Sequence, residues 1–481
     1  MKQIKFLALL VITIFATSCE DTFLSPELTT GINAESYYAN DEEIEKAVIN
    51  IYDGIQGVNS FANSSSTANH AVQVEFYVTE MRSDNTRTKS QEGESAQFDS
   101  FKVEATNGFV ADYYRSFYNV IFRSNVVLEN LEAATADNAI KFEAEAKFLR
   151  AYAYFNLVRL FGDIPLIDRV ITPADKETAY TRVAVANIYD LITSDLLTAI
   201  DGLDDTHKNR ASLAAAEALL AKVYLTQPSP NYSGAQALCE SIMQPTRGFS
   251  LISNFRDIFY TEGNDEVIFA IGYESGSSVD SQNFSAEWLN AVGRTSGVNY
   301  VTTEGVAALD AMGGDRTAVS YRVDVGQPTQ NQVTKYLPNG EDGGADGKTF
   351  SSNAQLSGND WIVSRYADVV LMHVEAIMAG GPSTSSSVAV ASFNSVRRRA
   401  NVADDADGII EKSELLDERR VELAFENQRL FDLIRMGEAV NILSTFSNDN
   451  AYDFSTTDLL LPIPQYEINL SNGLLTQNPG Y

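Results

Sequence analysis

Apolar residues recur along much of the chain at the spacing of an amphipathic helix. In the stretch 42–56, four of them lie three or four positions apart and share one helical face: Ile44, Val48, Ile51 and Ile55. The same periodicity continues through residues 111–134, 185–200 and 212–225. It predicts a mostly α-helical protein whose helices come in pairs on a tetratricopeptide-like framework, although no clean 34-residue repeat period is present.

The central part of the chain has a different pattern. Residues 264–360 are rich in Gly, Ser, Asn and Thr, and short apolar runs such as 266–273 predict strands within irregular structure. Helical periodicity returns over residues 361–446. We therefore divide the mature chain into an N-terminal helical region, residues 19–263, and a C-terminal region, residues 264–481, that begins with the irregular insert. Loops held on a rigid framework are frequent places for binding sites.

The first residues have the pattern of a secretory signal peptide. Two lysines precede an apolar stretch, Phe6–Phe15, which is too short to span a bilayer because that requires about 20 apolar residues. Residues 16–19 resemble a bacterial lipobox, in which Cys19 would be acylated and become the new N-terminus once residues 1–18 are removed. The alternative is an ordinary cleavage site followed by an unmodified cysteine. The second cysteine, Cys239, lies in an apolar helical segment, and we expect it in the core.

Charge excludes one class of function. Removing the signal peptide takes two lysines and no acidic residue from 35 basic and 65 acidic residues, which leaves a net charge of −32. A surface with this charge repels a phosphate backbone, so we expect no nucleic-acid binding.

The sequence offers little catalytic chemistry. Its three histidines, His70, His207 and His373, are isolated, so no His-x-x-x-His zinc pair exists, and no Gly-x-Ser-x-Gly segment is present. His373 lies on an apolar stripe, where we expect a hydrogen-bonded core histidine. A surface-anchored hydrolase remains an alternative, but without a coherent catalytic set to support it.

Residues 403–414 come close to a calcium-binding loop. Asp405, Asp407 and Glu414 occupy positions 3, 5 and 12 of the twelve-residue pattern, but Ala403 stands at position 1, where a carboxylate is required. We favour an acidic turn whose Ser413 caps the next helix over a structural calcium site, and we expect no other cofactor.

Three segments together carry a more specific pattern. Residues 144–167 alternate small and aromatic residues and end in a Gly-Asp-x-Pro turn, residues 365–376 place Tyr366 and His373 on one face, and residues 418–439 repeat glutamate every fourth position. With the lipobox and the terminal Asn-Pro-Gly-Tyr, these segments closely resemble the SusD/RagB family of outer-membrane nutrient-binding lipoproteins, over essentially the whole mature chain.

This resemblance implies a protein anchored by lipid to the outer membrane and facing the outside of the cell. It implies capture of glycans, as oligo- or polysaccharides, and their delivery to a TonB-dependent, SusC-like transporter. Some members of the family bind peptides instead, and the sequence leaves that alternative open.

Three glutamates in the last segment, Glu418, Glu422 and Glu426, stand four residues apart, as on one face of a helix. Like charges at this spacing repel, so we expect cations among them, with Arg419 and Arg429 nearest in sequence. The pattern favours an ion-pair network that joins helices over a metal or catalytic cluster.

The resemblance also implies a ligand site built from loops near the first helices and loops of the insert. A sugar ring needs an aromatic plane together with polar groups for its hydroxyls. The candidate ligand-binding residues are Phe61, Asp84, Asn85, Arg87, Trp288 and Tyr300. Among them we expect Trp288 to form an exposed platform, because polar residues and glycine surround it, whereas Trp361 just before a helix is expected in the core.

Overall fold

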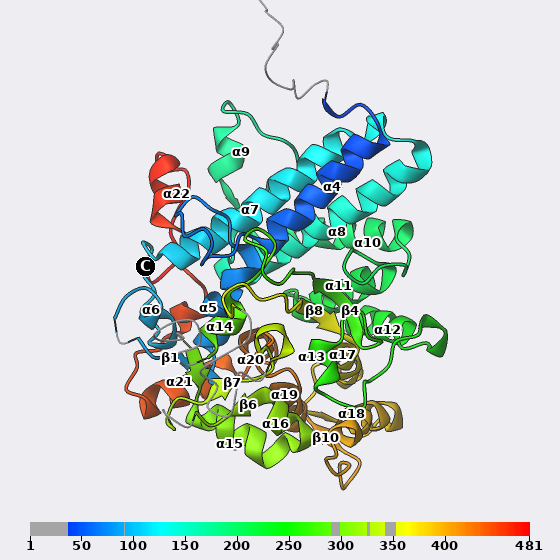
Figure 1. The fold of residues 1–481 in the computed structure, drawn as a ribbon, viewed down its shortest axis with the longest axis vertical. Helices are drawn as coiled ribbons and strands as arrows, with labels where there is room; N and C mark the ends of the chain where they lie inside the picture. Colours follow the sequence, from blue (N-terminus) through cyan, green and yellow to red (C-terminus); the bar gives the residue numbers. More distant parts are fainter. Residues whose placement is uncertain (1–36, 91, 290–298, 325–327, 342–352) are drawn as a thin grey trace, which may run out of the picture.

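The computed structural model describes residues 37–90, 92–289, 299–324, 328–341 and 353–481. Its framework is a row of helices, each packed against the next (Figure 1). In order along the row these are α4 (Asp41–Gln56), α7 (Gly108–Glu129), α8 (Ala136–Phe161), α10 (Val185–Gly202), α11 (Leu213–Thr226), α12 (Tyr232–Ile242), α17 (Tyr366–Met378) and α18 (Ser387–Arg399). The predicted mostly helical, tetratricopeptide-like framework is confirmed.

Shorter helices connect and extend this row. Those before α17 are α5 (Glu75–Val78), α6 (Ala96–Asp99), α9 (Lys176–Tyr180), α13 (Asp257–Tyr260), α14 (Phe284–Glu287), α15 (Thr303–Met312) and α16 (Thr317–Ser320). Those after α18 are α19 (Lys412–Glu422), α20 (Arg429–Arg435), α21 (Ala439–Asp449) and α22 (Gln465–Leu470). Helix α15 lies inside the insert, where the composition had indicated only strands and loops.

The strands of the described residues form two-stranded antiparallel pairs. The pairs are β1 (Thr86–Thr88) with β5 (Asn299–Val301), β2 (Ile164–Pro165) with β3 (Arg182–Val183), β4 (Val267–Ile271) with β8 (Trp361–Arg365), β6 (Tyr321–Arg322) with β7 (Gln332–Val333), and β9 (Ser383–Thr384) with β10 (Ile410–Glu411). Strand β4 confirms the strand predicted within residues 266–273. Because β4 pairs with β8, the start of the insert lies beside the strand that leads directly into α17.

The first helix of the row shows how local sequence fixes its ends. Asn40 caps α4 by accepting a hydrogen bond from the Glu43 backbone N–H at 3.2 Å, and three acidic residues in the first turn suit the helix dipole. The helix ends at Gly57, whose φ is +69°. A side chain at Gly57 would approach the His70 carbonyl oxygen to 2.1 Å, so the close return of the loop 57–70 requires glycine there.

Helix α8 is the buried centre of the row. Its neighbours α7 and α10 cover it on either side, and Phe148, Tyr154 and Phe155 are fully buried. The alternating small residues give these rings room to pack, which explains the pattern seen in the sequence. After the helix ends, the Tyr154 hydroxyl donates to the Ile167 carbonyl at 2.9 Å and fixes the turn that follows.

The segment 418–439 does not form the continuous helix that its glutamate spacing predicts. Helix α19 ends at Glu422, and Phe425 and Asn427 take positive φ values of 65° and 58° before α20 begins at Arg429. Glu426 therefore lies in a turn, away from the helical face that carries Glu418 and Glu422. The prediction of one face for all three residues is wrong, because a left-handed turn breaks the helix.

Other expectations concern single residues. Cys239 is a buried free cysteine, and Trp361 is 5% exposed, so both belong to the core as predicted. His373 is also buried, and its Nδ1 lies 3.0 Å from the Ser392 hydroxyl. Cys19 lies outside the described residues. Among the described helices, none has the length and apolar character needed to cross a membrane.

Candidate functional site

Two of the predicted ligand-binding residues, far apart in the sequence, meet across a short sheet. Strand β1 carries Arg87 and pairs with β5, which carries Tyr300, and the two residues are direct cross-strand partners. Residues of opposite strands in such a pair have adjacent side chains on one face. The expectation that loops near the first helices meet loops of the insert is therefore realised at these strands.

The Arg87 guanidinium is the centre of a polar cluster, which we call the Arg87 cluster (Arg87, Asp99, Tyr300, Asn450 and Tyr452). It donates to Asn450 Oδ1 at 2.6 Å and to the Tyr452 hydroxyl, and it lies over the Tyr452 ring. Its Nε atom, 4.0 Å from the Asp99 carboxylate, donates no hydrogen bond. Burial raises the pKa of Asp99 to about 6, although the Thr88 backbone N–H and Arg87 act against this shift. The cluster thus combines two tyrosines with a fixed cation, groups suited to hydrogen-bonding hydroxyls.

Asp84 and Asn85 do not face a ligand surface. Asp84 is 4% exposed, and Arg429 donates to both of its oxygens at 2.8 and 3.0 Å while Arg420 lies 3.0 Å away. Despite burial, these two cations hold the pKa of Asp84 well below its usual range. Asn85, 2% exposed, accepts from Arg420 at 2.9 Å and donates to Glu80. Both side chains fasten this segment to α19 and α20, so the expectation that they contact ligand is corrected.

Trp288 is likewise part of the core. It is 1% exposed, and its ring centre lies 5.3 Å from that of Phe76 and 5.9 Å from that of Phe425. The short helix α14 explains this, because it turns Phe284 and Trp288, four residues apart, into the interior. The predicted exposed platform at Trp288 is therefore wrong.

Phe61 is the exposed aromatic residue among the six candidates, with 51% of its surface accessible. It lies in the loop 57–70, which we call the Phe61 loop. Asn59 fixes this loop: its Oδ1 accepts from the Phe61 backbone N–H at 2.9 Å, and its Nδ2 donates to Ser281 Oγ and the Gln355 carbonyl at 2.9 and 2.8 Å. The loop is thus bound to the insert, and an aromatic ring stands exposed where the two meet.

Three members of the Arg87 cluster could not be recognised from the sequence. Asp99 ends the four-residue helix α6, whereas Asn450 and Tyr452 follow the end of α21, and no motif links them to Arg87. Only the tertiary fold brings these segments together.

The acidic turn at residues 403–414 uses its carboxylates locally. Asp405 and Asp407 accept from backbone N–H groups of Gly408 and Ile409 at 2.7 and 2.9 Å, and Glu414 accepts from the Glu411 N–H at 2.8 Å in a capping box. Glu411, rather than the expected Ser413, is the cap. No group of three His, Cys, Asp or Glu side chains placed to hold a metal occurs among the described residues. A structural calcium ion at this turn stays the less favoured alternative.

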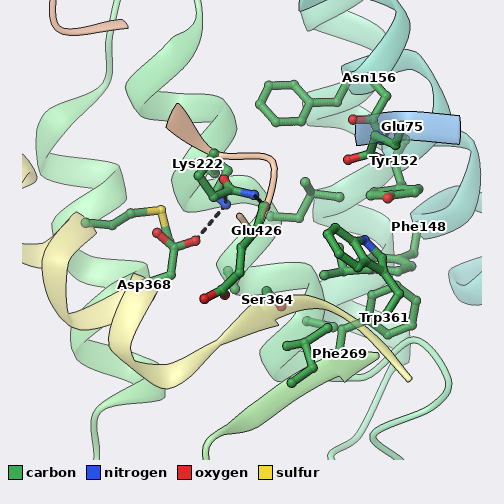
Figure 2. A pocket seen from close by; sticks show the side chains of 18 of the residues that line it. Glu75, Phe148, Tyr152, Asn156, Lys222, Phe269, Trp361, Ser364, Asp368 and Glu426 are labelled. Carbon is green, nitrogen blue, oxygen red and sulfur yellow. Dashed lines mark hydrogen bonds and ion pairs between the residues drawn. The ribbon is translucent and has the colours of Figure 1, made fainter. Parts of the chain in front are cut away.

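An interior cavity lies beside α8 and β8 (Figure 2). Its volume of about 40 Å³ suits a few water molecules and is too small for a sugar ring. Lys222 and Asp368 form an ion pair of 2.6 Å at one side. Glu75 faces the cavity with one oxygen that accepts no hydrogen bond, and burial raises its pKa to about 7. The charges here are largely paired within the protein, so this cavity is no glycan site.

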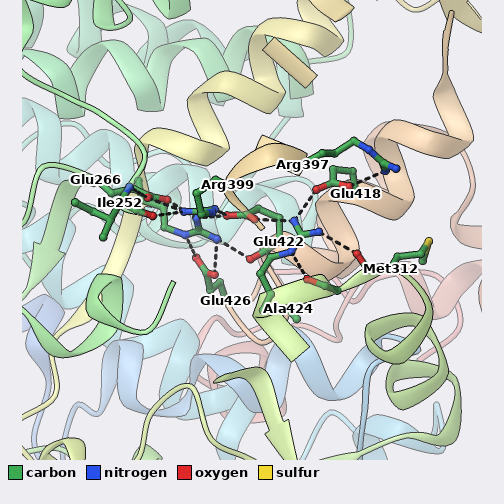
Figure 3. A network of polar contacts seen from close by, with 12 residues as sticks. Ile252, Glu266, Met312, Arg397, Arg399, Glu418, Glu422, Ala424 and Glu426 are labelled. Carbon is green, nitrogen blue, oxygen red and sulfur yellow. Dashed lines mark hydrogen bonds and ion pairs between the residues drawn. The ribbon is translucent and has the colours of Figure 1, made fainter. Parts of the chain in front are cut away.

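A network of buried ion pairs joins the insert to the C-terminal helices (Figure 3). Arg365 contacts Glu266, Glu422 and Glu426 at 2.6 to 2.8 Å. Arg316 pairs with Glu418 and Glu422, Arg399 with Glu266 and Glu422, and Lys335 with Glu426. The predicted ion-pair network is confirmed, but with other cations: Arg419 pairs with Asp368 and Asp432, and Arg429 with Asp84.

Comparisons with known proteins agree on one group. A family model described as "SusD family" matches residues 300–481, and one described as "Starch-binding associating with outer membrane" matches residues 36–225. The chain is 28% identical over 437 residues to a SusD-like protein P2 of Formosa agariphila, covering 81% of this chain and 84% of that protein.

Solved structures show the same relationship. A laminarin-binding SusD-like protein superposes with a TM-score of 0.75 at 25% identity, over 92% of this chain and 100% of the other. A surface glycan-binding protein A from Bacteroides thetaiotaomicron, in complex with laminarihexaose, gives a TM-score of 0.74 at 22% identity, over 91% and 99% of the two chains. At that lower identity the second match speaks for the fold alone.

Proposed function

This chain belongs to the SusD/RagB family, and from that premise we propose that it captures glycans at the cell surface without cleaving them. The observation that carries the proposal is the superposition on a laminarin-binding protein over that protein's whole length. That protein is named for binding laminarin and not for a reaction, which supports capture over catalysis.

We place glycan contact at the Phe61 loop, because it presents an exposed aromatic ring where the first helices meet the insert. A sugar ring stacks its apolar C–H face on such a ring. The Arg87 cluster is a second candidate contact, since Tyr300 is partly exposed and the side chain of Arg87 is 28% exposed. Its tyrosine hydroxyls would hydrogen-bond sugar hydroxyls.

Calorimetry against a panel of polysaccharides that includes laminarin tests this proposal, with the solution analysed for released sugars. Phe61→Ala should weaken glycan binding by about tenfold, because one aromatic contact contributes on the order of 1–3 kcal/mol. Phe122→Ala is the matched control, since Phe122 is similarly exposed at 47% on α7. Binding of peptides without glycans, or release of sugars, would overturn glycan capture without turnover. If the Phe61→Ala protein binds glycan as tightly as the unchanged protein, the glycan contact does not lie at the Phe61 loop.

The location and partner belong to the same proposal. Acylation of Cys19 would anchor the chain in the outer membrane, facing outward, and the description of the matching family model supports that membrane. There the protein would deliver glycans to a TonB-dependent, SusC-like transporter. Extraction in a mild detergent should recover both proteins together, and repeated recovery of this chain alone would contradict the partnership.

A further inference from the structure

A cleft in the surface is lined entirely by residues outside the insert. It is bounded by α7, by the segment that leads into α9, and by the C-terminal helix α22, which Figure 1 shows near one another. Its volume is about 310 Å³, enough for one sugar ring. We call it the tyrosine cleft, because Tyr114, Tyr118 and Tyr180 line it.

The aromatic walls of this cleft are fixed in place. The rings of Tyr114 and Tyr118 lie 4.8 Å apart, and the Tyr118 hydroxyl donates to the Pro165 carbonyl at 2.8 Å. Tyr114 is buried, whereas Tyr118 and Tyr180 are partly exposed. The faces of aromatic rings carry negative electrostatic potential and attract cations.

Two hydrogen-bond acceptors in the cleft have no donor among the described residues. The Oδ1 atom of Asn119 is buried and accepts no hydrogen bond. The carboxylate of Glu467, at the α22 side, accepts none either, and burial raises its pKa while Arg115 acts against this. A buried acceptor without a donor costs free energy, so the Asn119 Oδ1 atom calls for a donor from outside the protein. The Glu467 carboxylate is partly exposed and offers a second acceptor that a ligand can reach.

Arg115 also lines the cleft, and its guanidinium already has partners within the protein. Arg115 donates to Asn69 Oδ1 at 3.3 Å, to the Ala68 carbonyl, and to Asp112, a carboxylate that it shares with His70. Glu467 is the carboxylate of the cleft lining, among three aromatic rings, and Arg115 is the cation there.

We propose that the tyrosine cleft binds the primary ammonium group of an aminated sugar residue. The ammonium donates to Glu467 and Asn119 and lies against the tyrosine rings, and the rest of the cleft holds the sugar ring. The choice of a sugar rests on the proposed function, whereas the choice of an ammonium group rests on the cleft alone.

Saturation-transfer NMR at pH 7 with glucosamine, glucose and N-acetylglucosamine tests the proposal on the mature protein. We expect saturable binding of glucosamine with a dissociation constant on the order of millimolar, as for other ligands of this size. Glucose and N-acetylglucosamine lack the charge and should bind at least about tenfold more weakly, because a hydrogen bond between charged groups is worth roughly that factor.

Variants assign any binding to the cleft. Glu467→Gln and Tyr180→Ala should each weaken glucosamine binding, with Glu467→Gln losing about tenfold or more. Glu177→Gln on α9 is the matched control, because Glu177 is exposed and does not line the cleft. Unchanged melting temperatures exclude unfolding as the cause. Glu467→Gln should leave any binding of laminarin unchanged, because Glu467 lies outside the Phe61 loop, so the two proposed sites fail or succeed separately.

Several results would overturn the inference. If glucose binds as tightly as glucosamine, the cleft is a site for neutral sugars. If butylamine binds as tightly as glucosamine, the cleft recognises an ammonium group without a sugar ring. Absence of saturable glucosamine binding, or full binding by Glu467→Gln, would refute the ammonium site itself.

Discussion

The buried ion pairs of Asp84 allow a sharp test of whether this residue is structural. Asp84→Asn keeps the volume of the side chain but removes the charge that two arginines, Arg420 and Arg429, face in the interior. Removing one partner of a buried ion pair costs about 3–5 kcal/mol of the free energy of unfolding, because the remaining charge stays desolvated. We therefore expect a loss of that size in urea-induced unfolding of the soluble mature chain.

Asp404→Asn is the control, since it makes the same change in an exposed pair. Asp404 and Arg398 are 42% and 61% exposed at the side chain, and solvent screens such pairs so that they contribute little to stability. A loss for Asp84→Asn no larger than for Asp404→Asn would refute the reasoning. A folded Asp84→Asn protein with lower glycan affinity would instead restore the sequence-based expectation that Asp84 binds ligand.

The pH dependence gives a second check on the same variant. The pKa of Asp84 is lower in the folded protein than its usual value of 3.8. Its stabilising contribution is thus fully present above pH 3.8 and is lost as the pH falls through the lower, folded-state pKa. The difference between the unchanged and Asp84→Asn proteins should stay constant from neutral pH down to about pH 5 and narrow only in stronger acid.

Three further predictions follow from the buried residues and the anchor. Trp288→Ala should lower the free energy of unfolding by about 3–5 kcal/mol through the cavity it leaves while calorimetry shows unchanged glycan affinity in the folded protein; a stable variant with weak binding would contradict the core assignment. Burial raises the pKa of Glu80 to about 7, so its contribution to stability is present below pH 4.5 and falls by about 3 kcal/mol as the pH rises through 7. In urea unfolding, the free energy of unfolding of Glu80→Gln relative to the unchanged protein should therefore be higher at pH 8 than at pH 4. The same relative value at both pH values would exclude the raised pKa of Glu80. Cys19→Ala should move the protein from the membrane to the soluble fraction, and retention in the membrane would rule out anchoring through Cys19.

The helices could be predicted because their information is local. Apolar spacing identified α4, α10 and α11 to within about two residues, and the apolar run at 266–273 identified β4. The break after Glu422 could not be seen in the same way, because Phe425 takes a left-handed conformation that its residue type does not favour, and Asn427 alone is too weak a signal. Tertiary contacts, among them the burial of Phe425 against Trp288, determine it.

The site was harder to predict for the same physical reason. Exposure depends on which segments cover a residue, and neighbours in sequence do not reveal that for Trp288 or Asp84. Arg87 and Tyr300 were both named from the sequence, yet their pairing across β1 and β5 needed the fold. Phe61 is the opposite case, a weak candidate in the sequence that the structure leaves exposed.

The ion-pair network around Arg365 has a consequence for how this protein can evolve. Each of Glu266, Glu422 and Glu426 contacts at least two cations, and the members come from segments spread between residues 266 and 426. A single replacement leaves a desolvated charge behind, so the effects of substitutions here are strongly non-additive. Accepted changes should therefore arise as compensated sets, such as an acid and its base lost together to apolar residues. Divergent descendants of this chain would then differ at these positions jointly, and isolated single differences would be rare.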